Sequence, residues 1–330
     1  MNRKKHDVVA LGELLIDFVQ ERDPMRQGKS FRLHAGGAPA NVAAAVSRLG
    51  GTSAFVGCVG DDPFGHELRD ILAGYQVDTT GMQFTRVCKT TLAFVQVAED
   101  GERSFQFYRQ PGADTMLEWN ETIGELIRQS RVFHFGSLSL TDEPARSATV
   151  RSVRTAADSS CLVTFDPNWR PMLWKDPDEA RGMILRMMEL ADVVKVSEEE
   201  LHFLIGEGGD LERKAEKLQE ICGIPLLLVT RGKDGCHYRF GASSGNVPAF
   251  PVRAVDTTGA GDSFMGAFLY QLTLLLEPGE PMNRLQAEQL QQMLRFACAA
   301  AAFCTTRSGA MDALPALPDV LRRLSPEEWK

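Results

Sequence analysis

A glycine-rich turn in the last third of the chain carries the residues best suited to chemistry. Gly259, Ala260 and Gly261 precede Asp262, and apolar residues at 264, 268 and 272 then repeat at the spacing of one helix face. A glycine-rich turn that opens a helix exposes free backbone N–H groups, which can stabilise an anion such as a transferring phosphoryl group. Asp262 lies beside those donors, where the helix dipole favours its ionised form, so it could accept a proton from a hydroxyl group. From this turn alone, a role for Asp262 in capping the helix is an equally good interpretation.

A second glycine cluster lies near the N-terminus and also leads into a predicted helix. Gly36 and Gly37 would expose backbone to a ligand, and the Asn41 amide can both donate and accept, which suits a polyol. Asp17 could take two hydroxyl groups of the same ligand. The alternatives are a local hydrogen bond for Asn41 at the helix start and a plain surface position for Asp17.

Strand-like and helix-like segments alternate along most of the chain and would position both clusters. The strands are short, apolar and mostly without alternation, as expected when both faces of a sheet are covered, and this predicts an α/β fold with a mostly parallel central sheet. We expect strands at 7–11, 54–59, 132–135, 161–166, 192–196 and 225–230, and helices at 39–50, 64–74 and 142–157.

Two segments interrupt this alternation. Residues 91–98 and 104–108 flank an Asp-Gly turn and predict a β-hairpin, and the polar stretch 16–34 resembles a β excursion more than a helix. Together they could form a small sheet that closes over a ligand, although an edge hairpin without a role is equally possible. Residues 206–210 predict a surface loop.

Composition excludes several classes of protein. The 330 residues include 36 Lys plus Arg and 44 Asp plus Glu, for a net charge of −8, and no basic cluster that would suit nucleic acid or an anionic membrane. No apolar run is long enough to span a bilayer. Seven cysteines without a CxxC pair indicate buried free thiols in a reducing, cytoplasmic compartment and no zinc site. Neither a Walker loop nor a Rossmann GxGxxG motif is present.

The two glycine clusters resemble the two signatures of the ribokinase-like carbohydrate and purine kinase family. The similarity runs from Leu11 to Pro315 and is carried by residues 36–43 (GGAPANVA), 57–65 (GCVGDDPFG), 165–170 (FDPNWR), 195–201 (KVSEEEL), 229–235 (VTRGKDG) and 256–262 (DTTGAGD). The resemblance implies one three-layer ribokinase-like α/β domain over 1–330, with a small β-sheet lid formed by about 16–34 and 90–110.

The resemblance also assigns roles to residues. It implies that Asp262 is the base that deprotonates a sugar hydroxyl, and that the N–H groups of Gly259, Ala260 and Gly261 form an anion hole for the γ-phosphoryl group of ATP. The implied sugar-binding residues are Asp17, Gly36, Gly37, Asn41, Tyr108, Arg109 and Arg170, and the implied ATP-binding residues are Lys195, Thr230, Gly232 and Gly235.

The resemblance implies two metal sites as well. Many members carry an Asn-x-x-Glu motif that organises Mg²⁺ through water, and this chain keeps the acid as Glu198 but has Lys195 in place of Asn. Lys195 could therefore reach a nucleotide phosphate directly. Asp256, Thr258, Arg307 and Gly309 match the region of a monovalent cation, K⁺, which is held largely by main-chain oxygens.

Within the family the motifs are most similar to those of fructokinases, which implies phosphorylation of fructose on its 6-hydroxyl group. A 2-keto-3-deoxygluconate kinase is an alternative, because Tyr108 with Arg109 and Arg170 could bind a carboxylate. An aminoimidazole riboside kinase is another. An inactive kinase-like binding or regulatory protein is the alternative from a different class, and the intact turn at 259–262 disfavours it. Members of the family often pair through their lids, so a homodimer is possible.

Overall fold

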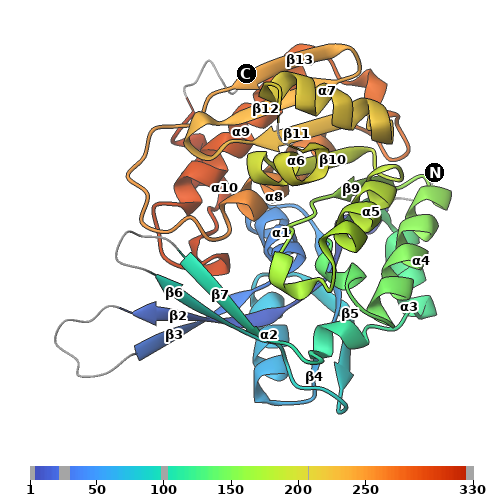
Figure 1. Cartoon of the computed structure of the whole chain (residues 1–330), viewed down its shortest axis with the longest axis vertical. Coiled ribbons are helices and arrows are strands. Elements are labelled where there is room, and N and C mark those ends of the chain that lie inside the picture. The colour runs from blue at the N-terminus through green and yellow to red at the C-terminus, as the bar shows by residue number, and fades with distance from the viewer. Residues whose placement is uncertain (1–3, 22–29, 98–102, 207, 325–330) are drawn as a thin grey trace.

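A nine-stranded sheet forms the centre of the molecule (Figure 1). The computed structural model describes residues 4–21, 30–97, 103–206 and 208–324. The strand order is β13-β12-β11-β10-β9-β8-β1-β4-β5; neighbours pair in parallel from β11 to β5, and β12 and β13 add an antiparallel edge. The strands are β1 (His6–Leu11), β4 (Ser53–Gly60), β5 (Asp78–Thr85), β8 (Ser130–Phe135), β9 (Leu162–Phe165), β10 (Val193–Ser197), β11 (Leu226–Thr230), β12 (Cys236–Phe240) and β13 (Ser243–Val247).

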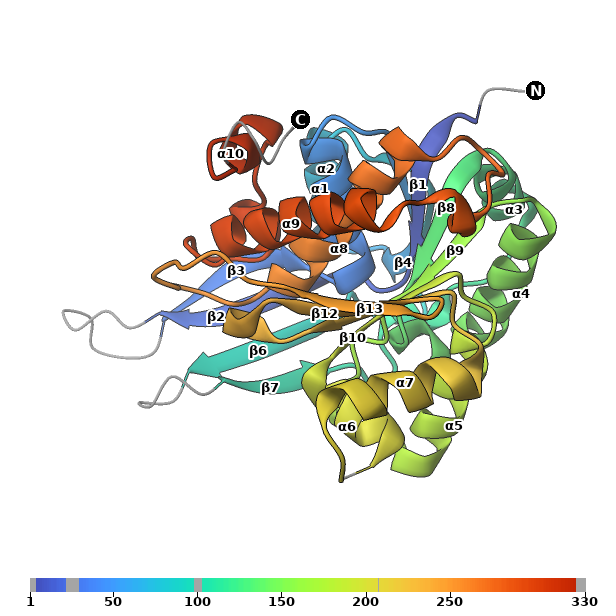
Figure 2. The same cartoon turned by 90° about the horizontal axis from the view of Figure 1, so that it is seen from above.

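Helices cover both faces of this sheet, so the predicted three-layer α/β fold is confirmed (Figure 2). One face packs against α3 (Glu121–Arg128), α4 (Ala145–Asp158), α5 (Pro177–Met188), α6 (Glu198–Ile205) and α7 (Leu211–Cys222). The other packs against α1 (Ala38–Arg48), α2 (Pro63–Gly74), α8 (Ala260–Leu275), α9 (Ala287–Cys304) and α10 (Leu317–Leu321).

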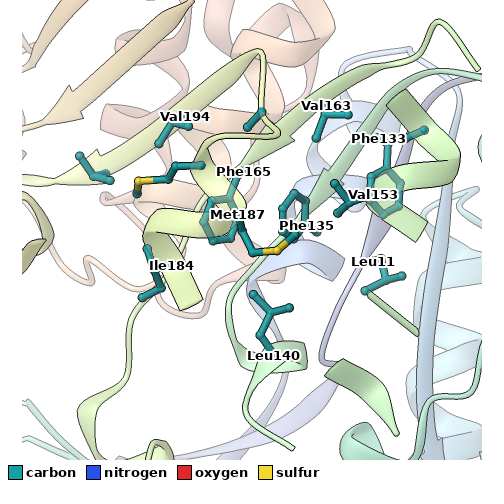
Figure 3. Packing of buried hydrophobic residues seen from close by; sticks show 14 of the residues in the cluster. Leu11, Phe133, Phe135, Leu140, Val153, Val163, Phe165, Ile184, Met187 and Val194 are labelled. Carbon is teal, nitrogen blue, oxygen red and sulfur yellow. The ribbon is translucent and has the colours of Figure 1, made fainter. Parts of the chain in front are cut away.

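Fully buried aromatic and aliphatic side chains fill the layer between the sheet and α4 and α5 (Figure 3). Phe135 on β8 stacks on Phe165 on β9, with ring centroids 4.4 Å apart, and Met187 of α5 lies over this pair. Successive side chains of a strand point to opposite faces, so Phe133 and Phe135 belong to this layer whereas Val132 belongs to the layer under α8 and α9. The sheet is therefore a rigid base for the loops at its carboxyl edge.

A second sheet of four strands projects from one end of the large sheet in both views (Figures 1 and 2). Its order is β3-β2-β6-β7; the outer pairs are antiparallel and the central pair is parallel. The predicted hairpin and the predicted β excursion are both confirmed, although the turns at 22–29 and 98–102 lie outside the described residues. The strands are β2 (Leu15–Glu21), β3 (Ser30–Gly36), β6 (Leu92–Val97) and β7 (Arg103–Tyr108).

Two features of the fold differ from or extend the predictions. The helix expected at 142–157 begins only at Ala145, because Pro144 has no N–H and fits only at a helix start. The strands β5, β12 and β13 were not predicted, since their sequences are polar or lie at a sheet edge. All seven cysteines are free and buried, as predicted, and no described helix is long and apolar enough to cross a membrane.

Candidate active site

The carboxyl ends of the central strands, the start of α8 and the small sheet enclose a cavity of about 290 Å³. Its polar side chains are three carboxyl groups, two amides, one guanidinium and the hydroxyl groups of Thr257 and Thr258, and Leu15, Phe107 and Leu138 add apolar walls. The carboxyl groups belong to Glu13, Asp17 and Asp262, the amides to Asn41 and Asn168, and the guanidinium to Arg170. Many side chains that can accept hydrogen bonds from hydroxyl groups, beside a few apolar ones, suit a small polyol as the ligand.

Asp262 lies in the first turn of α8 and is almost completely buried, with 7% of its surface exposed. Asn41, at a distance of 221 residues in sequence, donates from Nδ2 to Asp262 Oδ2 at 2.8 Å. Burial raises the pKa of Asp262 to about 6, although the Asn41 hydrogen bond and the charges of Lys195 and Arg170 oppose this. Burial is therefore the largest influence on this carboxyl group, contrary to the full ionisation expected from the helix start, and a pKa near 6 would suit proton transfer near neutral pH.

Asp17 lies on β2 and faces the same cavity from the small sheet. Desolvation raises its pKa to about 7, against the opposing charges of His34 and Arg170. Its carboxylate packs so closely over Gly36 that a Cβ there would lie 2.1 Å from Asp17 Oδ2. Gly37 precedes α1 with φ of 115°, and a Cβ there would lie 2.3 Å from the Glu13 carbonyl oxygen. Gly36 thus leaves room for the Asp17 carboxylate on the neighbouring strand, and Gly37 lets the start of α1 approach the loop between β1 and β2.

Glu13 is a cavity residue that the sequence reasoning missed. The Ala38 N–H donates to Glu13 Oε1 at 2.8 Å, so Glu13 caps the start of α1, and burial raises its pKa to about 7. Phe107, Leu138 and Asn168 were missed as well. An acid between Gly12 and Leu14, directly after a buried strand, was the one available signal for Glu13.

The structure does not bring Tyr108 and Arg109 to this cavity within the described residues. Tyr108 is 59% exposed on the opposite face of the small sheet, where its ring contacts Phe94. Arg109 is buried and pairs with Asp114, with Nη2 2.6 Å from Oδ2, and donates to Thr141 Oγ1 and to the Leu138 carbonyl. Its charge is therefore already neutralised inside the protein.

A second cavity, of about 570 Å³, lies on the other side of the glycine-rich turn. Thr230, Gly232 and Gly235, all predicted to contact ATP, line it at the turn between β11 and β12. Most of its remaining lining is apolar and comes from residues 249–254 and α9, as expected for a site that holds a purine ring. Thr257 and Gly261 line both cavities, so the two cavities meet at the start of α8.

Lys195 and Glu198 lie on β10 and at the start of α6, and neither side chain lines the two cavities. Lys195 on β10 donates from Nζ to Asp166 Oδ2 at 2.7 Å, and both side chains are buried. Glu198 begins α6 and is half exposed, with Arg231 Nε at 3.7 Å from its Oε2. One such carboxylate suits Mg²⁺ held through water, and among the described residues no cluster of acids, His or Cys could hold a metal directly.

The residues expected around a monovalent cation are brought together in part. Asp256 accepts hydrogen bonds from the Thr258 N–H at 2.7 Å and from the Gly309 N–H at 3.1 Å, which joins two loops beside the turn. Such adjoining loops present main-chain oxygens, the ligand type that fits K⁺. Arg307 is exposed, and its guanidinium lies over the Phe303 ring. Its side chain therefore packs on α9 and does not join the loops that Asp256 connects.

Comparisons with known proteins agree with this geometry. The family model described as pfkB family carbohydrate kinase matches residues 5–317. A probable fructokinase-2 of Arabidopsis thaliana is 47% identical over 311 residues, which are 93% of this chain and 92% of that relative. The crystal structure of a Xylella fastidiosa fructokinase with bound ATP superposes with a TM-score of 0.88 at 37% identity, covering 98% of this chain and 99% of that one. A Vibrio cholerae O395 fructokinase with fructose, ADP and calcium bound gives 0.84 at 34% identity, with 96% and 98% covered.

Proposed function

The chain belongs to the pfkB family of carbohydrate kinases, and we propose that it transfers the γ-phosphoryl group of ATP to the 6-hydroxyl group of fructose. One observation carries the proposal. A cavity whose side chains can accept hydrogen bonds from sugar hydroxyl groups meets an apolar nucleotide-sized cavity at Gly261, beside the buried Asp262 carboxyl group and the first N–H groups of α8, of which the Ala260 N–H makes a turn contact of 3.3 Å to the Thr257 carbonyl. The fructokinases among the similar proteins support fructose as the acceptor.

The mechanism follows from the positions of these groups. Asp262 takes the proton of the 6-hydroxyl group, the hydroxyl oxygen attacks the γ-phosphorus, and the bond from that phosphorus to the bridging oxygen of ADP breaks. The N–H groups at residues 259–261 stabilise the negative charge on the transferring group. Magnesium bound with ATP would neutralise phosphate charge, and Glu198 would hold it through water. K⁺ would lie against the loops that Asp256 joins.

The charge of the acceptor cavity favours a neutral sugar over an acid sugar. Three acids, Glu13, Asp17 and Asp262, line it against the single guanidinium of Arg170, so an anionic substrate would meet more repulsion than attraction. Arg109, which could have bound a carboxylate, is paired with Asp114 instead. We therefore rank 2-keto-3-deoxygluconate below fructose as a substrate, and aminoimidazole riboside is the neutral alternative that the substrate panel tests.

We further propose that the small sheet is a lid and that two copies of the chain pair through it. Side chains alternate along its strands, so Asp17 and Phe107 face the cavity whereas Phe18, Phe94 and Tyr108 form an aromatic layer on the other face. The exposed part of that layer offers apolar area to a second copy. Seven buried free thiols support a reducing, cytoplasmic location.

A substrate panel tests the proposed function. The purified chain is assayed for ADP release with fructose, ribose, 2-keto-3-deoxygluconate and aminoimidazole riboside, each with ATP, Mg²⁺ and K⁺. We expect the highest kcat/KM with fructose and a product phosphorylated on the 6-hydroxyl group. A higher kcat/KM with another acceptor would overturn the assignment of fructose, and binding of sugar without ADP release from any acceptor would indicate an inactive kinase-like protein.

A further inference from the structure

A buried ion pair lies directly beneath the start of α8. Lys195 Nζ donates to Asp166 Oδ2 at 2.7 Å, and the two side chains are 5% and 0% exposed. Asp166 follows the last residue of β9, and Lys195 is the third residue of β10, the parallel neighbour of β9. The adjacent strands therefore place the two residues side by side.

Strand alternation directs the Lys195 side chain toward α8. Val193, two residues earlier, packs in the layer under α8 and α9, whereas Val194 and Val196 pack in the opposite layer. A Cβ built on Gly261 would lie 2.9 Å from Lys195 Nζ. The ammonium group thus lies against Gly261, the residue at which the two cavities meet, although Lys195 itself lines neither cavity.

We propose that Asp166 is a positioning residue, which holds the Lys195 ammonium group charged and fixed against Gly261 so that it meets the transferring phosphoryl group. This inference rests on the proposed function, since only a kinase brings that group to Gly261.

Within the described residues, the Asp166 carboxylate has no other hydrogen-bond partner. Its Oδ2 contacts Lys195, and its buried Oδ1 has no hydrogen-bond partner in the described part of the chain. A buried ion pair of this kind adds little to stability, because desolvation of the two charges offsets their attraction. Lysine has a flexible four-carbon stem, so an ammonium group that must meet one phosphoryl oxygen benefits from a fixed partner.

The surrounding charges are consistent with a protonated lysine. The groups that face Lys195 from neighbouring elements are Asp166, Glu200 of α6, Asp262 of α8, His134 of β8 and Cys236 of β12. Burial lowers the pKa of Lys195, but the charges of Asp166 and Glu200 more than offset it and raise the pKa above that of an ordinary lysine. Burial also lowers the pKa of His134 to about 3, so His134 is neutral and does not compete for Asp166.

The test compares Asp166→Asn with the wild-type chain in steady-state kinetics and in calorimetric titration with ATP alone. Loss of the counter-charge leaves Lys195 buried without a partner, so the ammonium group deprotonates more easily and moves. We expect kcat/KM for ATP to fall about 10- to 100-fold, as for loss of one charge-assisted hydrogen bond to phosphate, while the KM for fructose changes little. The alkaline limb of the pH profile of kcat/KM for ATP should move to lower pH, which a loss of packing alone would not cause.

A double-mutant cycle keeps the proposal testable if Asp166→Asn folds poorly. Lys195→Met removes the ammonium group, and adding Asp166→Asn to it should change kcat/KM for ATP by less than about threefold, because Asp166 acts through Lys195. Asp192→Asn is the matched control, since Asp192 contacts the Val163 N–H at the far end of the same strands. It should leave the pH profile unchanged.

Two results would overturn the proposal. One is an additive loss in the double variant, which would show that Asp166 acts independently of Lys195. The other is an Asp166→Asn variant with wild-type ATP binding and an unmoved alkaline limb. Failure of the proposed function itself is recognised separately, because the wild-type chain would then release no ADP with fructose.

Discussion

Asp262 provides the sharpest test, because one substitution should reduce activity and increase stability. Asp262→Asn keeps the shape of the side chain and can still accept the Asn41 hydrogen bond, but it cannot accept a proton at neutral pH. Loss of a general base reduces turnover by about 10²- to 10⁴-fold. The glycine turn and Lys195 remain, so some activity and nearly full sugar binding should remain too.

The stability effect follows from the pKa of Asp262. Burial raises it from 3.8 to about 6, so the folded protein holds the proton more tightly than the unfolded chain does. The folded state is therefore stabilised relative to the unfolded chain at low pH, and this contribution is lost as the pH rises through about 6. The pKa difference corresponds to roughly 3 kcal/mol of unfolding free energy. We expect Asp262→Asn to regain up to this amount at pH 7 to 8 and to gain nothing near pH 3.

Two measurements check this prediction. A coupled assay of ADP release gives turnover, and urea unfolding at several pH values gives the free energy of unfolding. Asp70→Asn is a suitable control, because Asp70 is an exposed carboxylate on α2 and should change neither quantity appreciably. A variant that keeps more than a tenth of wild-type turnover, or that loses activity and stability together, would refute the reasoning.

Three further predictions concern the acceptor cavity and the small sheet. Gly36→Ala should raise the KM for sugar about 10- to 100-fold, because the new Cβ would lie 2.1 Å from Asp17 Oδ2 and displace that carboxylate; sugar titration at saturating ATP measures it. Burial raises the pKa of Asp17 to about 7, and only the ionised carboxylate accepts hydrogen bonds from two sugar hydroxyl groups. We therefore expect kcat/KM for sugar to rise with pH up to about 7 and then to level off. A flat profile from pH 5 to 8 would contradict this. Asp114→Asn should lower the free energy of unfolding by about 3 to 5 kcal/mol, because it leaves the buried charge of Arg109 unpaired, and urea unfolding against the wild type measures it.

The fold and the two glycine clusters could be predicted because both depend on local sequence. Short apolar segments alternate with helical ones, and this pattern fixes the layers of an α/β fold. Asp262 and Asn41 each follow a glycine-rich turn that opens a helix, so each could be identified separately. Their mutual hydrogen bond joins residues 221 positions apart, and only the resemblance to a family connected the two clusters in advance.

The other residues of the candidate site could not be predicted, because their roles depend on which way each side chain points and on what surrounds it in the folded chain. The hairpin at 91–108 was predicted, but its strand alternation turns Phe107 toward the cavity and Tyr108 away from it. Arg109 was considered for carboxylate binding, and its neutralisation by Asp114 is a tertiary contact. The sequence placed Asp262 at a helix start, where the helix dipole lowers a carboxyl pKa. It did not show how deeply Asp262 is buried, and burial raises its pKa.

The burial of all seven thiols has a practical consequence for watching the small sheet move. Burial raises the pKa of most of these cysteines to between about 11 and 12, so the reactive thiolate is scarce and poorly accessible at neutral pH. Leu33 on β3 is 44% exposed. A cysteine introduced there would be far more exposed than any native thiol. A maleimide dye on it could report the position of the sheet as sugar and nucleotide are added, with the native cysteines kept, and prior binding of nucleotide would shield Cys298, which lines the second cavity.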